Sequence, residues 1–120
     1  MFEKLLEKAK SDRDILAVAV YGSFARGEKH RDIDICLIPY PGKPRNRKEL
    51  EYMKLLGDGY DVHMFQELPI YIRSRVIKEG RIILCKDDSI LYDLYLDTIR
   101  EYSLFEPHYQ TYLHAVARNG

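Results

Sequence analysis

The chain has 120 residues, with 19 lysines and arginines against 19 aspartates and glutamates, so its formal net charge is zero. Hydrophobic residues make up 46% of the chain, which is enough for a core that needs no disulfide or structural metal. The balanced charge argues against nucleic acid as the main partner, because phosphate-dominated binding leaves a clear excess of lysine and arginine. We therefore predict a single domain over residues 1–120.

The N-terminal segment is amphipathic and contains acidic residues, unlike a secretory signal or a transit peptide. No window approaches the ~18 apolar residues that a membrane span requires. The two cysteines, Cys36 and Cys85, each lie in an apolar run, which indicates reduced core residues and not metal ligands. We expect a cytoplasmic protein without a membrane partner.

Helix and strand patterns alternate along the chain. Apolar residues at a spacing of three or four indicate helices, and short apolar runs rich in β-branched residues and bounded by glycine or proline indicate strands. In chain order we predict a helix over 2–11, strands over 15–21 and 33–38, a loop over 41–46, a helix over 48–56, a strand over 60–65, a helix over 69–79 and a strand over 81–85.

Two features concern the helices. Leu50, Met53 and Leu56 recur at helical spacing, which indicates the second helix, and the glycines at 57 and 59 end it. The helical stretch after residue 88 contains Pro107, which lacks the amide hydrogen of a helix interior, so we predict two segments broken there. The fold class is therefore α/β (α+β): a small mixed sheet with flanking helices over about 5–86, then a C-terminal helical pair over about 88–118.

The segment 21–34 is the most informative part of the sequence. A strand ends in Gly22 and Ser23, and a short turn carries Arg26. A glycine at a strand end lets the backbone approach a ligand, and the amides that follow can point donors at an anion. The Ser23 hydroxyl and the Arg26 guanidinium add further phosphate donors. The turn is therefore a candidate phosphate-binding site.

Carboxylates follow this turn. Asp32 and Asp34 occupy alternate positions of a strand, so their side chains project from the same face, about 6.6 Å apart along it. Asp61 stands near the start of the next strand; if the two strands are neighbours, the three carboxylates converge. Such a group suits two magnesium ions, which together clamp the attacking and leaving oxygens of a displacement at phosphorus.

This combination resembles the active-site signature of the nucleotidyltransferase superfamily with the DNA polymerase β fold, in particular its minimal nucleotidyltransferase (MNT) branch. The resemblance extends from the first helix to the fourth strand. It implies that Gly22 and Ser23 hold a nucleoside triphosphate, that Asp32 and Asp34 bind magnesium, and that Asp61 completes the metal site and helps deprotonate the acceptor hydroxyl. Eight residues separate Ser23 from Asp32, a connection shorter than most of the family has.

The resemblance also implies a function. It predicts magnesium-dependent transfer of AMP from ATP to a hydroxyl, with release of pyrophosphate. Solo MNT proteins are often the antitoxin halves of HEPN/MNT toxin–antitoxin pairs, so the expected acceptor is a tyrosine of a HEPN-type toxin. A second hypothesis is a noncatalytic module that binds nucleotide or toxin and neutralises its partner by complex formation. Small-molecule and RNA-end acceptors are less favoured, because the chain offers neither a larger acceptor domain nor a basic groove.

Several of these residues also have a purely structural interpretation. Asp32 and Asp34 could form surface ion pairs with Arg26 or with its basic neighbours Lys29 and Arg31. Asp58 rivals Asp61, but its glycine neighbours are typical of a turn.

The remaining polar and aromatic residues are less specific. His63 shares strand parity with Asp61 and could face the site, but we interpret it as structural, and we interpret His30 as solvent-exposed. A basic run could contact nucleotide phosphates or an acidic partner, although solvation is the default expectation; it comprises Lys43, Arg45, Arg47 and Lys48. Five tyrosines lie on helices late in the chain, where we expect most to pack internally and the remainder to leave a surface for a partner. They are Tyr92, Tyr95, Tyr102, Tyr109 and Tyr112.

Overall fold

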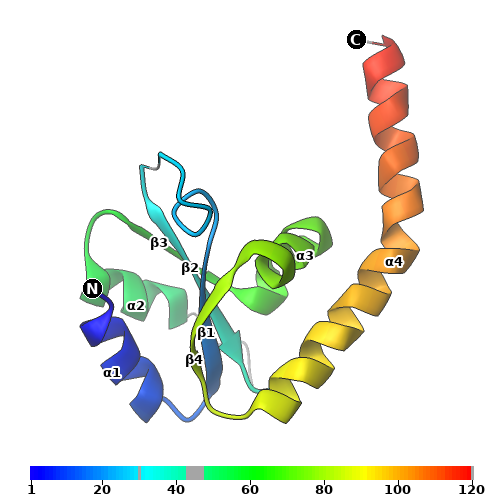
Figure 1. Cartoon of the computed structure of the whole chain (residues 1–120). Helices are drawn as coiled ribbons and strands as arrows, with labels where there is room; N and C mark the ends of the chain where they lie inside the picture. The colour runs from blue at the N-terminus through cyan, green and yellow to red at the C-terminus, as the bar shows by residue number, and fades with distance from the viewer. Residues whose placement is uncertain (30, 43–47, 120) are drawn as a thin grey trace.

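The computed structural model describes residues 1–29, 31–42 and 48–119; the predictions for His30, Lys43, Arg45 and Arg47 lie outside these residues. Helices and strands follow the predicted order closely (Figure 1). They are α1 (Glu3–Ser11), β1 (Ile15–Tyr21), β2 (Ile33–Pro39), α2 (Lys48–Leu56), β3 (Tyr60–Met64), the short 3₁₀ helix η1 (Phe65–Glu67), α3 (Ile70–Glu79), β4 (Arg81–Cys85) and α4 (Asp88–Asn119).

The four strands form one mixed sheet in the order β3-β2-β1-β4. β1 runs antiparallel to both β2 and β4, whereas β2 and β3 are parallel. Every residue of β1 is buried, as its continuous apolar run predicts for a central strand. The parallel pairing places the beginnings of β2 and β3 side by side at one edge of the sheet, next to the end of β1.

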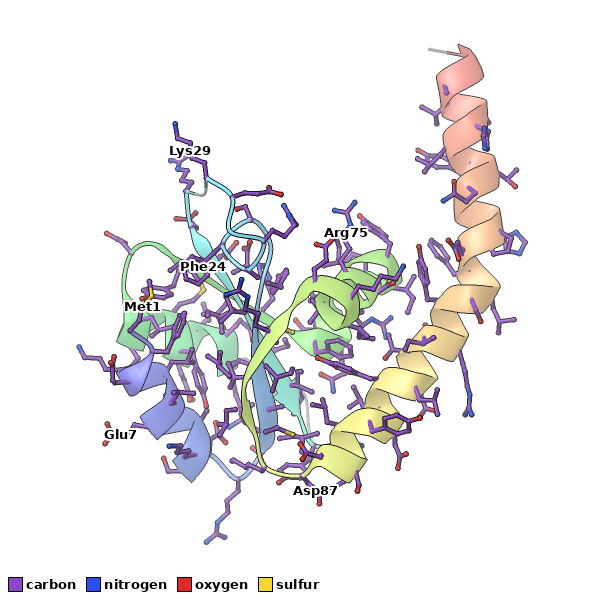
Figure 2. All side chains as sticks on the ribbon, in the orientation of Figure 1. Met1, Glu7, Phe24, Lys29, Arg75 and Asp87 are labelled. Atoms are coloured by element: carbon purple, nitrogen blue, oxygen red, sulfur yellow. The ribbon has the colours of Figure 1, made fainter. Side chains whose placement is uncertain are left out.

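Helices cover both faces of the sheet, α1 and α2 on one and α3 and α4 on the other, and side chains fill the space between (Figures 1 and 2). Alternate residues of β1 serve the two cores: Val18 and Val20 belong to one, Ala17 and Ala19 to the other. Both cysteines are free thiols, as predicted; Cys36 is buried and Cys85 only partly so.

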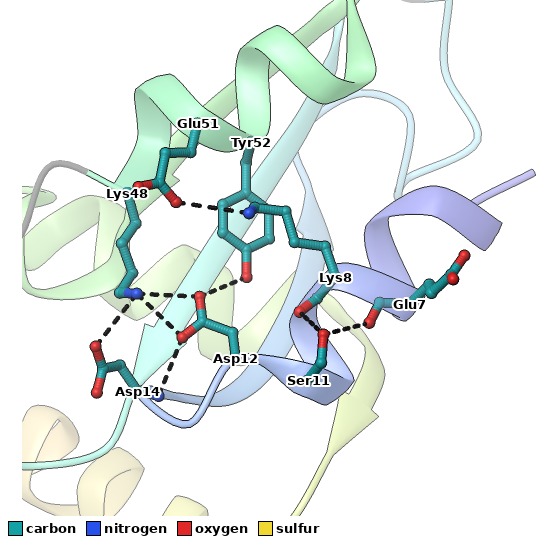
Figure 3. A network of polar contacts seen from close by, with 8 residues as sticks. All are labelled: Glu7, Lys8, Ser11, Asp12, Asp14, Lys48, Glu51 and Tyr52. Carbon is teal, nitrogen blue, oxygen red and sulfur yellow. Dashed lines mark hydrogen bonds and ion pairs between the residues drawn. The ribbon is translucent and has the colours of Figure 1, made fainter.

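α2 packs against the core through Tyr52, Met53 and Leu56. Leu50 is 52% exposed, whereas Tyr52 is completely buried. The Tyr52 hydroxyl donates a hydrogen bond of 2.9 Å to the Asp12 carboxylate, which orients this face toward α1 (Figure 3). Lys48 lies 3.0 Å from Asp12 and 3.2 Å from Asp14, so its interpretation as part of a solvated run was wrong.

The C-terminal region is one helix of 32 residues with Pro107 inside it, so the predicted helical pair is wrong. The outer half of α4 extends away from the sheet and its axis changes direction along its length (Figure 1). A solvent-exposed helix can bend around proline while water satisfies the carbonyl that loses its donor. Within the described residues, no helix is long and apolar enough to cross a membrane.

The α4 tyrosines divide between core and surface. Tyr95 stacks on Phe65 with ring centroids 5.7 Å apart, and Tyr102 is half-buried. Tyr92 and Tyr112 are 66% and 63% exposed, so the expectation that most of these residues pack internally holds only in part. The Tyr109 side chain lies outside the described residues.

Candidate functional site

A tight turn follows β1. Gly22 and Gly27 both have positive φ, +77° and +74°, which L side chains rarely adopt. Between them the backbone makes helix-like bonds: the Arg26 amide donates to the Gly22 carbonyl at 3.2 Å, and the Glu28 amide donates to the Ser23 carbonyl at 2.9 Å. The sequence prediction of a short turn at the strand end is confirmed.

The turn lies directly against a carboxylate. Tyr21, the last residue of β1, pairs with Asp34 on β2, which places Gly22 beside the Asp34 side chain. A Cβ atom at Gly22 would overlap the Asp34 carboxylate. Despite the short connection between Ser23 and Asp32, the turn contacts the predicted metal-binding carboxylate of Asp34.

Two aspartates face each other across the parallel strands. Asp34 and Asp61 are direct register partners, so the condition on strand adjacency is met. His63 lies two residues after Asp61 on the same face, with its Nε2 3.2 Å from an Asp61 carboxylate oxygen. Ligand atoms of these three residues all lie within 4.8 Å of one another. We interpreted His63 as structural from its sequence context; its parity with Asp61 was the signal for the cluster.

Asp32 lies outside this group. It occupies an exposed bend immediately before β2, whose pairing with β3 begins at Ile33 and Tyr60, so strand pairing does not fix it as it fixes Asp34. Its charge nevertheless contributes to the electrostatics of Asp34. Asp58 lies in the turn before β3, as predicted.

The site concentrates negative charge. Burial raises the pKa of Asp34 above its ordinary value, and the charges of Asp61 and Asp32 raise it further, against opposing contributions from His63 and Arg26. Within the described ranges, no lysine or arginine forms an ion pair with Asp34 or Asp61. Two facing carboxylates with an adjacent imidazole are a donor set that accepts a divalent cation, and their oxygens suit magnesium.

A cavity of about 260 Å³ adjoins Asp34 and the turn. The end of β1, the turn that follows it, β2 and α3 contribute to its walls. The lining residues are Tyr21, Gly22, Ser23, Arg26, Asp34, Ile72, Arg75 and Glu79. The α3 residues in this wall were not predicted from the sequence, although their helical spacing places them on one face of α3.

Arg26 does not pair with the aspartates. Its guanidinium lies 3.0 Å from Glu28 and 3.0 Å from Glu79, so the alternative in which Arg26 forms a surface pair with Asp32 or Asp34 is wrong. The turn is thereby linked to α3 by two residues that line the cavity.

Sequence comparison supports the resemblance found in the signature. A family model described as "Polymerase beta, Nucleotidyltransferase" matches residues 3–89. A Methanocaldococcus jannaschii protein to which protein adenylyltransferase activity is ascribed is 42% identical over 71 residues, covering 58% of this chain and 55% of the relative. The match thus spans about half the length of that relative.

Solved structures show the same fold. One chain comes from a toxin–antitoxin complex with AMP-PNP, with a TM-score of 0.74, 16% identity, and coverage of 95% of this chain and 96% of that one. Another comes from a complex of the tri-AMPylated Shewanella oneidensis HEPN toxin with its MNT antitoxin, with a TM-score of 0.71, 14% identity, and coverage of 95% and 93%. The predicted nucleotidyltransferase fold is confirmed.

Proposed function

This chain belongs to the polymerase β nucleotidyltransferase family, and we propose that it transfers AMP from ATP to a hydroxyl group and releases pyrophosphate. One observation carries this proposal: Asp34 and Asp61 face each other in register, and the Gly22 turn lies against Asp34. The facing carboxylates, the glycine turn and the cavity that Asp34 lines are therefore adjacent. Nucleotidyl transfer depends mainly on such positioning and on neutralisation of charge.

Asp34 and Asp61 would hold magnesium, with Asp32 at the exposed edge of the site. When bound, the ion neutralises charge on the phosphate oxygens. Without a cation the two facing carboxylates repel each other, which is consistent with the raised pKa of Asp34. The donor set therefore fits the cofactor that the family resemblance implies.

The chain's own groups account for the remaining steps. The Ser23 hydroxyl donates a hydrogen bond to a phosphate oxygen, and the turn amides orient the triphosphate. The acceptor oxygen forms a bond to the α-phosphorus while the bond to the β-phosphate oxygen breaks, and pyrophosphate leaves. The acceptor proton passes to the Asp61 carboxylate, in the role that the family resemblance implies.

We propose a tyrosine of a HEPN-type toxin as the acceptor. The side chains of Asp61 and His63 are 47% and 40% exposed, so a residue of another protein can reach them from solvent. The adenylyltransferase activity ascribed to the archaeal relative supports transfer to protein. The similarity to chains of toxin–antitoxin complexes supports a toxin as the partner.

The test is intact-mass measurement after incubation with ATP and magnesium, with and without a HEPN-type protein encoded beside this chain. We expect the partner to gain one or more adenylyl groups, and Asp34→Asn plus Asp61→Asn to abolish the gain. Asp58→Asn, which removes a carboxylate in the turn before β3, is the matched control and should retain activity. A tight complex with no mass change and no nucleotide binding would favour the noncatalytic module instead.

A further inference from the structure

We infer that Arg75 on α3 contacts the outer phosphates of the nucleotide, and that Arg26 instead positions the turn. This inference rests on the proposed function, because it requires the cavity beside Asp34 to receive a triphosphate. It reverses the prediction from sequence, in which Arg26 was the phosphate-binding arginine.

The Arg26 guanidinium is already committed to carboxylates. Its Nε and Nη2 donate to the two oxygens of Glu28 at 3.0 and 3.3 Å, and its Nη1 donates to Glu79 at 3.0 Å. Three of its five N–H donors, one on each nitrogen, are therefore already used by carboxylates, which leaves fewer for a phosphate. The pairing with Glu79 joins residues that are 53 positions apart, so Arg26 links the turn to α3.

Arg75 faces the same cavity without such commitments. Ile72, Arg75 and Glu79 line it at helical spacing, and the burial of neighbouring Ser74 and Val76 fixes the rotation of α3. Arg75 is exposed, and in the described part of the chain no carboxylate forms an ion pair with it. Figure 2 shows its side chain extending from the upper side of α3.

The position of the carboxylates indicates which phosphates Arg75 contacts. The reacting phosphorus belongs beside Asp34, which lines the cavity together with the Gly22 turn and pairs with Asp61 across the parallel strands. The other phosphates would then extend toward α3, where Arg75 stands. A guanidinium presents a fork of donors that matches phosphate oxygens. Arg75 should therefore favour ATP over AMP, which lacks the outer phosphates.

The test is calorimetric titration of ATP and of AMP, each with magnesium, into the wild-type chain, Arg75→Ala, Arg26→Ala and Lys78→Ala. Lys78 is the matched control, since it lies on α3 over the Tyr102 ring, away from the cavity. We expect Arg75→Ala to weaken ATP binding about tenfold and to leave AMP binding unchanged. Arg26→Ala should weaken both nucleotides less and to a similar degree, and Lys78→Ala should resemble wild type.

Wild-type ATP affinity in Arg75→Ala, or a larger loss in Arg26→Ala, would overturn the inference. Failure of the wild-type chain to bind ATP would overturn both the inference and the proposed function. ATP binding that depends on Arg75, without transfer to any partner, would refute the proposed function and still support the inference.

Discussion

Two clusters of charged side chains lie at different places in the molecule and are built in opposite ways. In the first, between α1 and α2, Lys48 lies 3.0 Å from Asp12 and 3.2 Å from Asp14, and Tyr52 donates to Asp12 (Figure 3). Its aspartates are matched by a cation and by hydrogen-bond donors. In the second, at the start of β2 and β3, two aspartates face each other with the His63 imidazole beside them.

The pKa values of the two clusters shift in opposite directions. Burial alone would raise the pKa of Asp12, but hydrogen bonds from Lys48, the Asp14 amide and Tyr52 outweigh it and lower the pKa below its ordinary value. The pKa of Asp34 is raised by burial and by Asp61. The first cluster is therefore complete within the protein and stabilises it, whereas the second has unbalanced charge that a ligand can satisfy.

The strongest test of this contrast is removal of charge from the site. Asp34→Asn should lower the rate of AMP transfer by about 10²–10³-fold, because it removes a proposed ligand of the ion that neutralises charge on the phosphate. It should not lower the free energy of unfolding, since it relieves repulsion from Asp61. Transfer assays and urea denaturation measure the two effects. A large loss of stability would show that the site cluster is a structural network like the first.

The turn beside Asp34 gives the next largest effect. Gly22→Ala should destabilise the fold by about 2–4 kcal/mol, because it combines backbone strain with an overlap on the Asp34 carboxylate. Gly27→Ala is the matched control: its φ is +74°, but a Cβ there meets nothing within 4 Å. We expect it to cost about 1–2 kcal/mol from strain alone. Equal losses in denaturation experiments would argue against close contact between turn and carboxylate.

Much of the fold could be predicted because its signals are local. The run over 15–21 is apolar and β-branched, and glycine and proline bound the other elements, so element order follows from sequence. The pairing of Asp34 with Asp61 was predicted on condition that their strands are neighbours, which they are. The fold and the approximate position of the carboxylates thus followed from pattern and spacing.

The remaining features depend on packing between distant segments. Lys48 reaches Asp12 across 36 positions only because α1 and α2 pack together, and no local pattern indicates that contact. Arg75 lines the cavity because of how α3 is rotated on the sheet. Pro107 predicts a break because proline removes a hydrogen bond from a helix interior. The outer half of α4 is exposed, so the helix can bend around the proline and continue.

Disruption of the cluster between α1 and α2 should have a smaller effect than Asp34→Asn or Gly22→Ala. Asp12→Asn should lower the free energy of unfolding by about 1–3 kcal/mol, the usual range for hydrogen bonds to a charged group. Transfer should not change, because Asp12 lies away from the cavity beside Asp34. Asp97→Asn on the exposed surface of α4 is the control and should leave stability unchanged.

The smallest expected effect is the pH dependence of the difference in free energy of unfolding between wild type and Asp12→Asn. Because the pKa of Asp12 is lower in the folded protein than its ordinary 3.8, the unfolded chain binds the proton first as the pH falls. The stability that Asp12 contributes is therefore fully present above about pH 5 and is lost as the pH falls through the folded-state pKa, below 3.8. Urea denaturation of wild type and Asp12→Asn between neutral pH and about pH 3 should show the two converging. A difference that stays constant or grows toward acid would mean that the Asp12 charge is not what Lys48 and Tyr52 stabilise, and the contrast between the two clusters would fail.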